Sequence, residues 1–329
     1  MRSRSGPISA LAVAVVLWGT TFVVSDTALE SMSPAVLTVA RFAIALLVLG
    51  PAAAVKGELV AVLRSAPVAV LGATGVAAYY GLQNLGLVTT GAGTAAVLQA
   101  ALPVATGLIA VVWLRERPSR GLIVGLGLAT VGVTLVAGKV AAEASPGATL
   151  IAVGVVAYAV YTVLLKRQPD RDPVVLAAAT CFWGLVFLLP WLAGEMLLDD
   201  ARLDVDRESI GVLVFLGIAA SALTLLLWTY GASRVPASTA GVFTAAIPAV
   251  GYLCAIVTGE PSSWAKTVGS VLALLGAAIA ARAGSPEDPR GPQALKMTSE
   301  PAASPHDPRA KGDTSVPADD DKRPICRTW

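Results

Sequence analysis

The chain carries the same apolar unit twice, and this duplication limits its possible folds more than any other feature. Residues 94–103, TAAVLQAALP, recur at 239–248 as TAGVFTAAIP, an offset of 145 positions. The same offset aligns Gly72 with Gly217, and offsets of 139 to 144 extend the match to the remaining segments. Solenoid and propeller repeats have periods of roughly 20 to 50 residues, so a unit of this length is half of the protein rather than a small repeat.

The composition indicates that both halves lie in a membrane. Hydrophobic residues make up 55% of the chain and charged residues 14%, and the mean hydropathy is +0.72, far above that of an average soluble domain. The apolar residues form continuous runs of about 17 to 25, the length that an α-helix needs to cross a ~30 Å hydrocarbon layer. These runs lack the alternation of a transmembrane β-strand, so we predict an all-α integral membrane protein.

Ten apolar runs are long enough to be transmembrane helices, five in each repeat. They cover residues 8–25, 34–54, 66–88, 92–114, 119–138, 147–165, 173–193, 209–232, 236–258 and 264–282. We therefore predict one five-helix repeat over residues 1–138 and a second over residues 147–283. Arg2 and Arg4 precede the first run, as in a signal peptide, but the run's counterpart in the second repeat argues against cleavage.

Basic residues near the helix ends predict the orientation, because they favour the cytoplasmic side of a membrane. If the N-terminus is cytoplasmic, twelve basic residues lie in inner loops: Arg2, Arg4, Lys56, Arg64, Arg115, Arg117, Arg120, Lys166, Arg167, Arg171, Arg234 and Arg282. Four then lie in outer loops: Lys139, Arg202, Arg207 and Lys266. We therefore expect both termini in the cytoplasm. Since each repeat has an odd number of spans, the second repeat is inverted relative to the first, a recurrent plan among transporters.

A set of motifs follows the same order along the apolar region. The set comprises the Trp18-Gly19 pair, Arg41, the TAAVLQAALP segment, and a proline followed about a dozen residues later by a glutamate, Pro103 to Glu116 and Pro248 to Glu260. This ordered set resembles the EamA-type transporters of the drug/metabolite transporter superfamily, over residues 8–283. The resemblance implies ten helices around a central cavity and export of small metabolites, often amino acids or related compounds, across the bacterial cytoplasmic membrane. Members of that family differ widely in substrate, so the resemblance does not name one.

Polar and aromatic side chains inside the spans are the candidate substrate-binding residues, because polar groups in hydrocarbon are costly unless they face the bundle or a wet cavity. Tyr79 and Gln83, for example, lie four positions apart on one helical face. Together with their repeat equivalents and the polar or aromatic residues of neighbouring spans, the predicted set is Trp18, Tyr79, Gln83, Gln99, Tyr158, Thr224 and Trp228. The alternative for any tyrosine or tryptophan is an interfacial aromatic belt, which we prefer for Trp183, Trp191 and Trp264.

Arg41 completes the predicted substrate-binding set, and two interpretations of it stand. It is the one basic residue well inside a span, about seven residues into the second helix and thus roughly 10 Å deep. In the first interpretation its guanidinium binds a substrate carboxylate or another anion through two hydrogen bonds. In the second it snorkels to the outer surface or bonds helix carbonyls and fixes packing. Its repeat counterpart is Thr180.

Pro103 and Pro248 fall within the fourth and ninth predicted spans. A proline inside a helix removes a backbone hydrogen bond and kinks the helix, so we predict a kink at both positions. Such a kink frees carbonyls toward a cavity and can act as a pivot, or it is a static bend that serves packing.

Several chemistries are excluded or left open by what the spans do not contain. No Asp, Glu or His lies in the middle of a predicted span, which weighs against bulky cationic drugs as the main cargo. Proton antiport would have to use edge residues such as Asp26, and facilitated diffusion stays open. The sequence has no Walker A loop, no metal-spaced Cys/His set and no Ser/His/Asp arrangement, since its single histidine, His306, lies near the C-terminus. We expect no catalytic residue, no bound metal, no cofactor and no nucleic-acid partner.

These inferences combine into one prediction. The protein is a multi-pass protein of the cytoplasmic membrane that exports a small metabolite, an amino acid or a related zwitterion or carboxylate, by alternating access. Import or facilitated diffusion of a small metabolite is the first alternative, and multidrug export is the second. The expected partners are the substrate and the lipid bilayer, and the protein is a monomer or a homodimer. Residues 284–329 contain eight prolines and few large apolar residues, so we expect a disordered cytoplasmic tail.

Overall fold

The described part of the chain is built almost entirely of helices. A computed structural model describes residues 5–99, 101–115, 118–137, 146–168, 170–204, 206–257 and 264–283. Within these ranges the β-type pairing is a single isolated bridge between Met32 and Leu203. The predicted all-α class is therefore confirmed for these residues. The predicted tail, 284–329, and the two repeat glutamates, Glu116 and Glu260, lie outside them.

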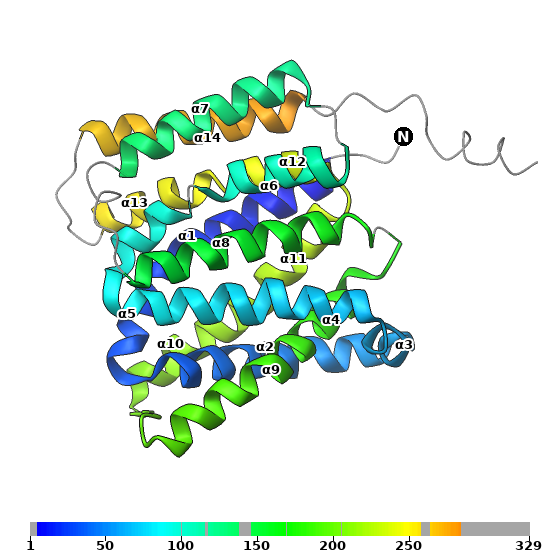
Figure 1. Ribbon diagram of the computed structural model, residues 1–329, viewed down its shortest axis with the longest axis vertical. Helices are drawn as coiled ribbons and strands as arrows, with labels where there is room; N and C mark the ends of the chain where they lie inside the picture. The colour runs from blue at the N-terminus through cyan, green and yellow to red at the C-terminus, as the bar shows by residue number, and fades with distance from the viewer. Residues whose placement is uncertain are drawn as a thin grey trace, which may run out of the picture. The chain divides into compact units, whose positions relative to one another are not determined.

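The helices follow one another in two matching series (Figure 1). The first series is α1 (Ser5–Ser31), α2 (Pro34–Ala54), α3 (Leu59–Leu63), α4 (Ala66–Gly72), the π-helical turn η1 (Ala73–Ala78), α5 (Tyr79–Leu98), α6 (Ala101–Trp113) and α7 (Arg120–Ala137). The second series is α8 (Pro146–Leu165), α9 (Pro173–Leu197), α10 (Arg207–Gly217), the π-helical turn η3 (Ile218–Leu223), α11 (Thr224–Ala232), α12 (Ala237–Phe243), α13 (Ala246–Val257) and α14 (Trp264–Ala283).

Helices of membrane-spanning length and polarity are present. Among the described residues, five helical stretches are long and apolar enough to cross a bilayer. They are Gly6–Ser31, Pro34–Ala54, Pro146–Leu165, Pro173–Leu197 and Arg207–Ala232. Shorter apolar helices occur at Ala101–Trp113, Arg120–Gly132, Ala237–Gly251 and Thr267–Gly276. The observed helices α1 and α9 extend beyond the predicted ends of their spans, because the residues that follow each predicted span continue the helix.

Helix α5 differs from the prediction, which put a loop at residues 89–91. Helical hydrogen bonding continues to Leu98, yet the side chain of Gln99 donates to that of Gln83, with Nε2 and Oε1 3.1 Å apart. A straight helix would separate these residues by about 24 Å, which two glutamine side chains cannot bridge. The helix must therefore bend sharply. The hydroxyls of Thr89 and Thr90 both donate to the carbonyl of Gly86, at 3.4 and 2.7 Å, and such back-bonding bends helices.

Two irregularities recur at the same offset as the sequence repeat. The π-helical turn at Ala73–Ala78 has its counterpart at Ile218–Leu223, 145 positions later. The helix also breaks between Leu98 and Ala101, and again between Phe243 and Ala246. At each break a backbone amide donates to the carbonyl three positions earlier, with nitrogen and oxygen 3.0 Å apart. These hydrogen bonds run from Leu102 N to Gln99 O and from Ile247 N to Thr244 O. π-helical turns and interrupted helices are frequent at functional sites, so a site is expected near these positions.

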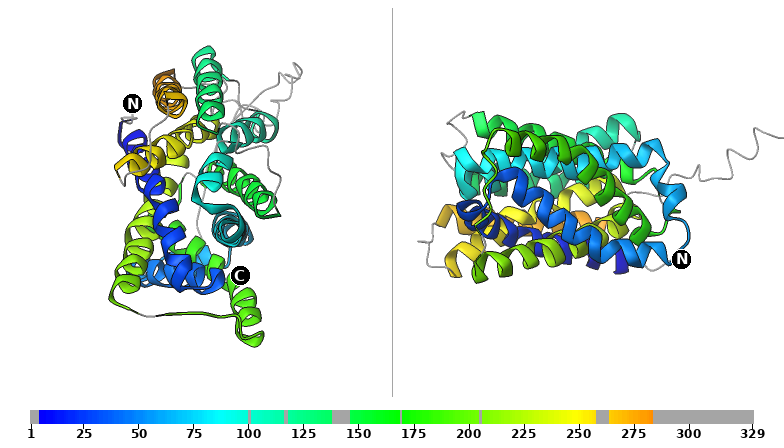
Figure 2. Two further views of the ribbon diagram at one scale, coloured as in Figure 1. Left: turned by 90° about the vertical axis from the view of Figure 1, so that its left-hand side faces the viewer. Right: turned by 90° about the horizontal axis from the view of Figure 1, so that it is seen from below.

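The helix contacts also occur in repeat-related pairs. Helix α5 packs on α8, as α11 packs on α1, and α4 packs on α9, as α10 packs on α2. Two further pairs join equivalent helices of the two series, α2 with α9 and α7 with α14. Figure 2 shows α7 and α14 side by side at one edge of the helical layers. The two series therefore interlock rather than fold as separate bodies.

Small residues allow the α7–α14 contact to be close. A Cβ at Gly276 would lie 2.5 Å from the carbonyl oxygen of Gly125 and 2.7 Å from the backbone nitrogen of Ala129. No real side chain fits at such distances, and small residues at these positions are typical of packed membrane helices. Gly276 therefore serves the packing of α14 on α7.

Polar contacts fasten α2 and α9 at both ends. At the start of α2, the carboxylate of Glu195 accepts from Ser33 Oγ at 2.6 Å and from the amide of Ala35 at 3.1 Å. At the start of α9, Lys56 Nζ lies 3.0 Å from Asp172 Oδ2. Asp172 also caps α9, because its Oδ1 accepts from the first free amides of that helix. The two helices are thus antiparallel and joined across the repeats.

We predict that Asp172→Ala lowers the free energy of unfolding by about 1 kcal/mol at neutral pH, because the variant loses a helix cap. Burial acts to raise the pKa of Asp172, but the Lys56 ammonium and the amides of Val174 and Val175 outweigh it and hold the pKa below its usual range. A lowered pKa stabilises the fold above the unfolded-state value of about 3.9, and this contribution disappears as the pH falls through the folded-state pKa.

Thermal unfolding in detergent micelles between pH 7 and pH 3 measures this effect. The matched control is Asp170→Ala, an exposed carboxylate two positions away, which should unfold like the wild type. A difference between wild type and Asp172→Ala that stayed constant down to pH 3 would contradict the electrostatic part of the explanation.

Candidate substrate-binding site

A chain of polar side chains lies at the first helix break. Gln99 follows the last residue of α5, and the bend in that helix brings it back against Tyr79 and Gln83. Tyr79 donates its hydroxyl to Gln99 Oε1 at 3.2 Å, and Gln99 Nε2 donates to Gln83 Oε1 at 3.1 Å. All three side chains are buried. The structure thus brings together three of the predicted residues from segments that the sequence separates by up to 20 positions.

An aromatic cluster adjoins this polar chain. The ring of Tyr79 lies 4.4 Å from that of Tyr158 on α8, between centroids. Trp18 on α1 contacts both Tyr158, at 5.3 Å, and Trp228 on α11, at 4.9 Å. These spacings are typical of favourable aromatic pairs. Six of the eight predicted residues therefore form one buried group at the meeting point of α1, α5, α8 and α11.

Tyr80 connects this group to Arg41, and the sequence analysis missed it. Its hydroxyl accepts from Trp18 Nε1 at 2.7 Å, and its ring lies 4.8 Å from Arg41 Cζ. The prediction followed the face defined by Tyr79 and Gln83, and Tyr80 belongs to the adjacent face. The available signal was a second polar pair, Tyr80 and Asn84, also four positions apart.

Arg41 is fully buried and does not reach the surface. Its Nε donates to Ser221 Oγ at 2.8 Å and its Nη2 to the carbonyl of Ala220 at 3.3 Å, and both acceptors lie in the π-helical turn η3. The guanidinium also stacks on Tyr80 and on Phe42, 5.5 Å from the latter ring centroid. Its Nη1 has no hydrogen-bond partner among the described residues. The buried position excludes snorkelling of Arg41. The contacts of Arg41 fit a packing role, and its Nη1 is also a donor available to a substrate.

Thr224 occupies a different position from the other predicted residues. Its hydroxyl is buried and donates to the carbonyl of Ala219 at 2.8 Å, a backbone oxygen of the π-helical turn. Trp228 Nε1 and Tyr158 Oη, by contrast, have no partners within the described part of the chain. Thr224 therefore stabilises the local helix geometry. Trp228 and Tyr158, in contrast, each place a polar atom without a hydrogen-bond partner among the described residues inside the cluster.

Pro103 and Pro248 stand beside the helix breaks. Each is the third residue of its helix, α6 and α13 respectively, and both are buried. In the first turn of a helix a proline costs no intrahelical hydrogen bond, because the missing N–H would have no partner there. The structure therefore places each proline directly after an interrupted helix rather than in the middle of a continuous one.

The whole cluster is closed to solvent. Each of the eight predicted side chains is at most 3% exposed. A surface groove lies between η1, α5 and α9, but its lining is almost entirely apolar and includes none of the eight. In the described residues, no three side chains of His, Cys, Asp and Glu gather where they could hold a metal ion. The chemistry available at the cluster is therefore hydrogen bonding, aromatic contact and one cation.

The three tryptophans assigned to an interfacial belt, Trp183, Trp191 and Trp264, are more exposed than the tryptophans of the cluster. Trp264 is 77% exposed, and Trp191 is partly exposed. Trp183 is half-buried and donates its indole N–H to the carbonyl of Leu63 at 2.9 Å.

We predict that Tyr80→Phe destabilises the protein by about 1 to 3 kcal/mol, because the Trp18 indole N–H is left buried without an acceptor. Trp18→Phe removes the same hydrogen bond, so the double variant should lose less stability than the sum of the two single losses. Denaturant unfolding in detergent micelles measures all three variants. Trp264→Phe is the control for the loss of an indole. Strict additivity of the two single effects would contradict the coupling.

Comparisons with known proteins agree with this architecture. The EamA-like transporter family matches twice, over residues 5–138 and 145–282. An uncharacterized transporter of Archaeoglobus fulgidus is 32% identical over 275 residues, which cover 83% of this chain and 97% of that protein. A probable terminal-alkyne amino-acid exporter of Streptantibioticus cattleyicolor is 34% identical over 281 residues, which cover 84% of this chain and 91% of that protein.

A solved crystal structure has the same fold. It matches with a TM-score of 0.69 at 24% identity and covers 84% of this chain and 97% of that one. The two family matches together span nearly the whole apolar part of the chain and confirm the resemblance drawn from the sequence motifs. The chain belongs to the EamA-like transporter family and is a membrane transporter.

Proposed function

We propose that the protein exports a small metabolite, an amino acid or a related zwitterion or carboxylate, across the cytoplasmic membrane by alternating access. The observation that carries the proposal is the buried polar and aromatic cluster at the helix break, to which both halves contribute side chains. Polar groups are costly inside a bilayer and usually mark a substrate pathway. The relative that is named a probable amino-acid exporter supports both the class of cargo and the direction.

The proposed architecture is ten transmembrane helices in two inverted five-helix repeats, residues 1–138 and 147–283, followed by a cytoplasmic tail at 284–329. The two family matches, the recurrence of the π-helical turns and the recurrence of the helix breaks support the two repeats. In transporters built this way, substrate sites lie near the middle of the membrane and are formed by interrupted helices. The cluster around Gln99 fits that plan.

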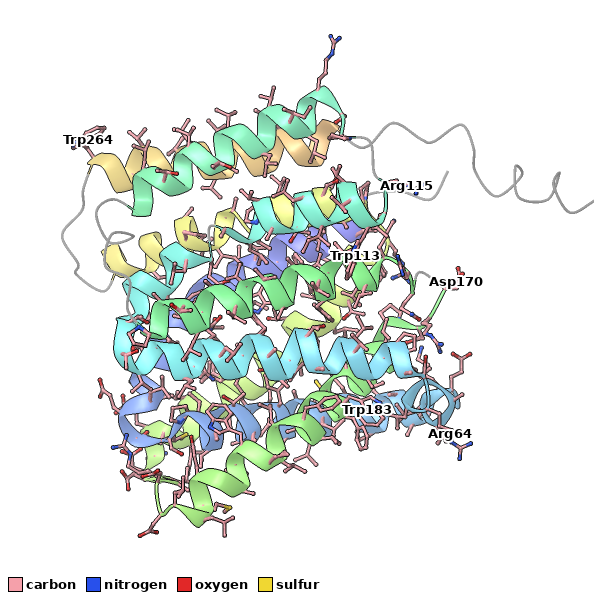
Figure 3. The ribbon with its side chains drawn as sticks, in the orientation of Figure 1. Arg64, Trp113, Arg115, Asp170, Trp183 and Trp264 are labelled. Atoms are coloured by element: carbon pink, nitrogen blue, oxygen red, sulfur yellow. The ribbon has the colours of Figure 1, made fainter. Side chains whose placement is uncertain are left out.

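The sidedness of the loops supports the proposed topology. Figure 3 shows Arg64, Arg115 and Asp170 at one end of the helical bundle and Trp264 at the other end. The first three residues come from loops that the alternation of ten spans puts on the cytoplasmic side, and Trp264 comes from a loop on the outer side. The end that carries the arginines is the one expected in the cytoplasm.

Each part of the cluster has a proposed task. The Arg41 guanidinium offers a charged donor for a carboxylate, and Gln83 and Gln99 offer amide groups that can exchange their mutual hydrogen bond for one to a substrate. The rings of Trp18, Tyr158 and Trp228 form an apolar surface for the substrate's side chain. Because the cluster is closed on all sides here, substrate entry requires α1, α5, α8 and α11 to separate toward one side at a time.

The coupling of transport is tested together with its substrate. Purified protein in proteoliposomes should move at least one labelled amino acid from a panel that also contains nucleosides and hydrophobic cations, with and without an imposed pH gradient. Acceleration by the gradient would show proton coupling through residues near the span ends, and insensitivity to pH would show facilitated diffusion. Transport of hydrophobic cations alone would contradict the proposal and favour a multidrug exporter.

We predict that Gln99→Leu lowers amino-acid transport by about tenfold or more, because the substitution leaves Tyr79 Oη and Gln83 Oε1 without their partner and removes an amide from the site. Gln168→Leu makes the same chemical change in a loop and should transport normally. Size-exclusion profiles and unfolding temperatures establish that both variants are folded. Wild-type transport by a folded Gln99→Leu protein would remove Gln99 from the substrate pathway.

A further inference from the structure

Asn84 is a buried polar residue next to the proposed site, and it lies outside the predicted substrate-binding set. It lies on α5 one turn after Tyr80, and its side chain is fully buried. Its Nδ2 donates to Thr38 Oγ1 on α2 at 2.8 Å. Its Oδ1 has no partner among the described residues. A buried amide oxygen without a donor is costly, so this atom calls for an explanation.

The orientation of the Asn84 amide is fixed by its neighbour. Thr38 has one hydroxyl proton, and it donates this proton to the carbonyl of Pro34 at 2.6 Å. The hydroxyl oxygen can then only accept from Asn84, so the amide nitrogen must face Thr38 and the oxygen must point away from it. Asn84 Oδ1 is therefore an acceptor that is available to a donor from a bound molecule.

Asn84 and Arg41 lie on neighbouring turns of the same helix contact. Arg41 follows Thr38 by three positions on α2, and Asn84 follows Tyr80 by four on α5. The two cross-links between these helices, from Asn84 to Thr38 and from Arg41 to the Tyr80 ring at 4.8 Å, are thus adjacent. Residues three or four apart are neighbours on a helix surface. Each of the two adjacent cross-links therefore carries one polar atom without a partner among the described residues, the donor Arg41 Nη1 and the acceptor Asn84 Oδ1.

We propose that Arg41 and Asn84 form a paired subsite for the two charged groups of an α-amino acid. The carboxylate binds Arg41 Nη1, and the ammonium group donates to Asn84 Oδ1. Arg41 is held in place for this by Ser221 and Ala220, which bind its other nitrogens. Trp18 is hydrogen-bonded to Tyr80 and belongs to the aromatic surface on which the side chain of the substrate would lie. This inference rests on the proposed function and narrows it from carboxylates in general to α-amino acids.

The pairing gives a reason for selectivity. A simple carboxylic acid would bind Arg41 but would leave the Asn84 oxygen buried without a hydrogen-bond donor. A simple amine would leave the Arg41 guanidinium without an acceptor for its free donor. A site built around a buried polar group discriminates strongly against ligands that fail to bond it. The subsite therefore requires both groups on the same molecule.

Binding to the purified full-length protein in lipid nanodiscs tests the inference by isothermal titration calorimetry. The probes are L-propargylglycine, which is a terminal-alkyne amino acid, 4-pentynoate, which lacks its ammonium group, and 3-butyn-1-amine, which lacks its carboxylate. Wild-type protein should bind the amino acid about tenfold or more tightly than either truncated probe. In Asn84→Leu, the preference for the amino acid over 4-pentynoate should be lost, because the acceptor that distinguishes the two probes is gone.

Two further variants separate a binding role from a structural one. Asn84→Asp keeps an acceptor and should retain the preference for the amino acid over 4-pentynoate. Thr229→Val changes the repeat equivalent of Asn84, a buried hydroxyl 3.3 Å from Tyr161 Oη, and should leave the preference unchanged. Equal wild-type affinity for the amino acid and 4-pentynoate would overturn the paired subsite and leave the proposed function intact. Failure of wild-type protein to bind any of the three probes would contradict the paired subsite, and only failure to transport every amino acid of the panel would contradict the proposed function as well.

Discussion

The fold depends on one constraint, which is that a backbone inside hydrocarbon must satisfy its own hydrogen bonds. This constraint explains why the apolar runs form helices and why interruptions are confined to particular places. The breaks after Leu98 and after Phe243 are tolerable because protein surrounds them. In addition, hydrogen bonds of 3.0 Å within each turn satisfy some of the backbone groups that the break leaves free. Polar side chains gather where the backbone is interrupted, since both need the same shielded surroundings. The candidate site is therefore a consequence of where the helices break.

The repeated parts of the sequence form the helical framework. The polar residues of the candidate site stand at positions where the two repeats differ. The equivalent of Arg41 in α9 is Thr180, whose hydroxyl donates to the carbonyl of Leu176 at 2.8 Å. The equivalent of Ser221 in the other π-helical turn is Val76, which is buried and apolar. One of two equivalent helix contacts thus holds a guanidinium with an unfilled donor, while its counterpart is packed without charge. This asymmetry favours a substrate that presents its charged groups to one half and its apolar part to the other.

Much of the fold follows from the sequence, because run length and the 145-residue offset are strong signals. The helical class and the grouping of Trp18 with Tyr79 and Tyr158 could be predicted, since the repeat identifies which helix faces correspond. The bend within α5 could not, because its glycines and threonines are equally typical of a loop. Tyr80 and Asn84 were missed because the prediction followed a single face spaced by four residues. The π-helical turn at Ala73–Ala78 adds residues to a turn and shifts which faces point inward, and such turns have no clear sequence signature.

The account predicts that the closed cluster is reached from each side of the membrane in turn, and site-directed thiol labelling tests this claim directly. Gln83→Cys would be placed in a chain whose three native cysteines are replaced by serine or alanine. A membrane-impermeant thiol reagent would then be applied separately to right-side-out and inside-out vesicles. Alternating access predicts modification from both sides, with a transported amino acid changing the ratio of the two rates. Modification from one side only, with and without the amino acid, would contradict the account.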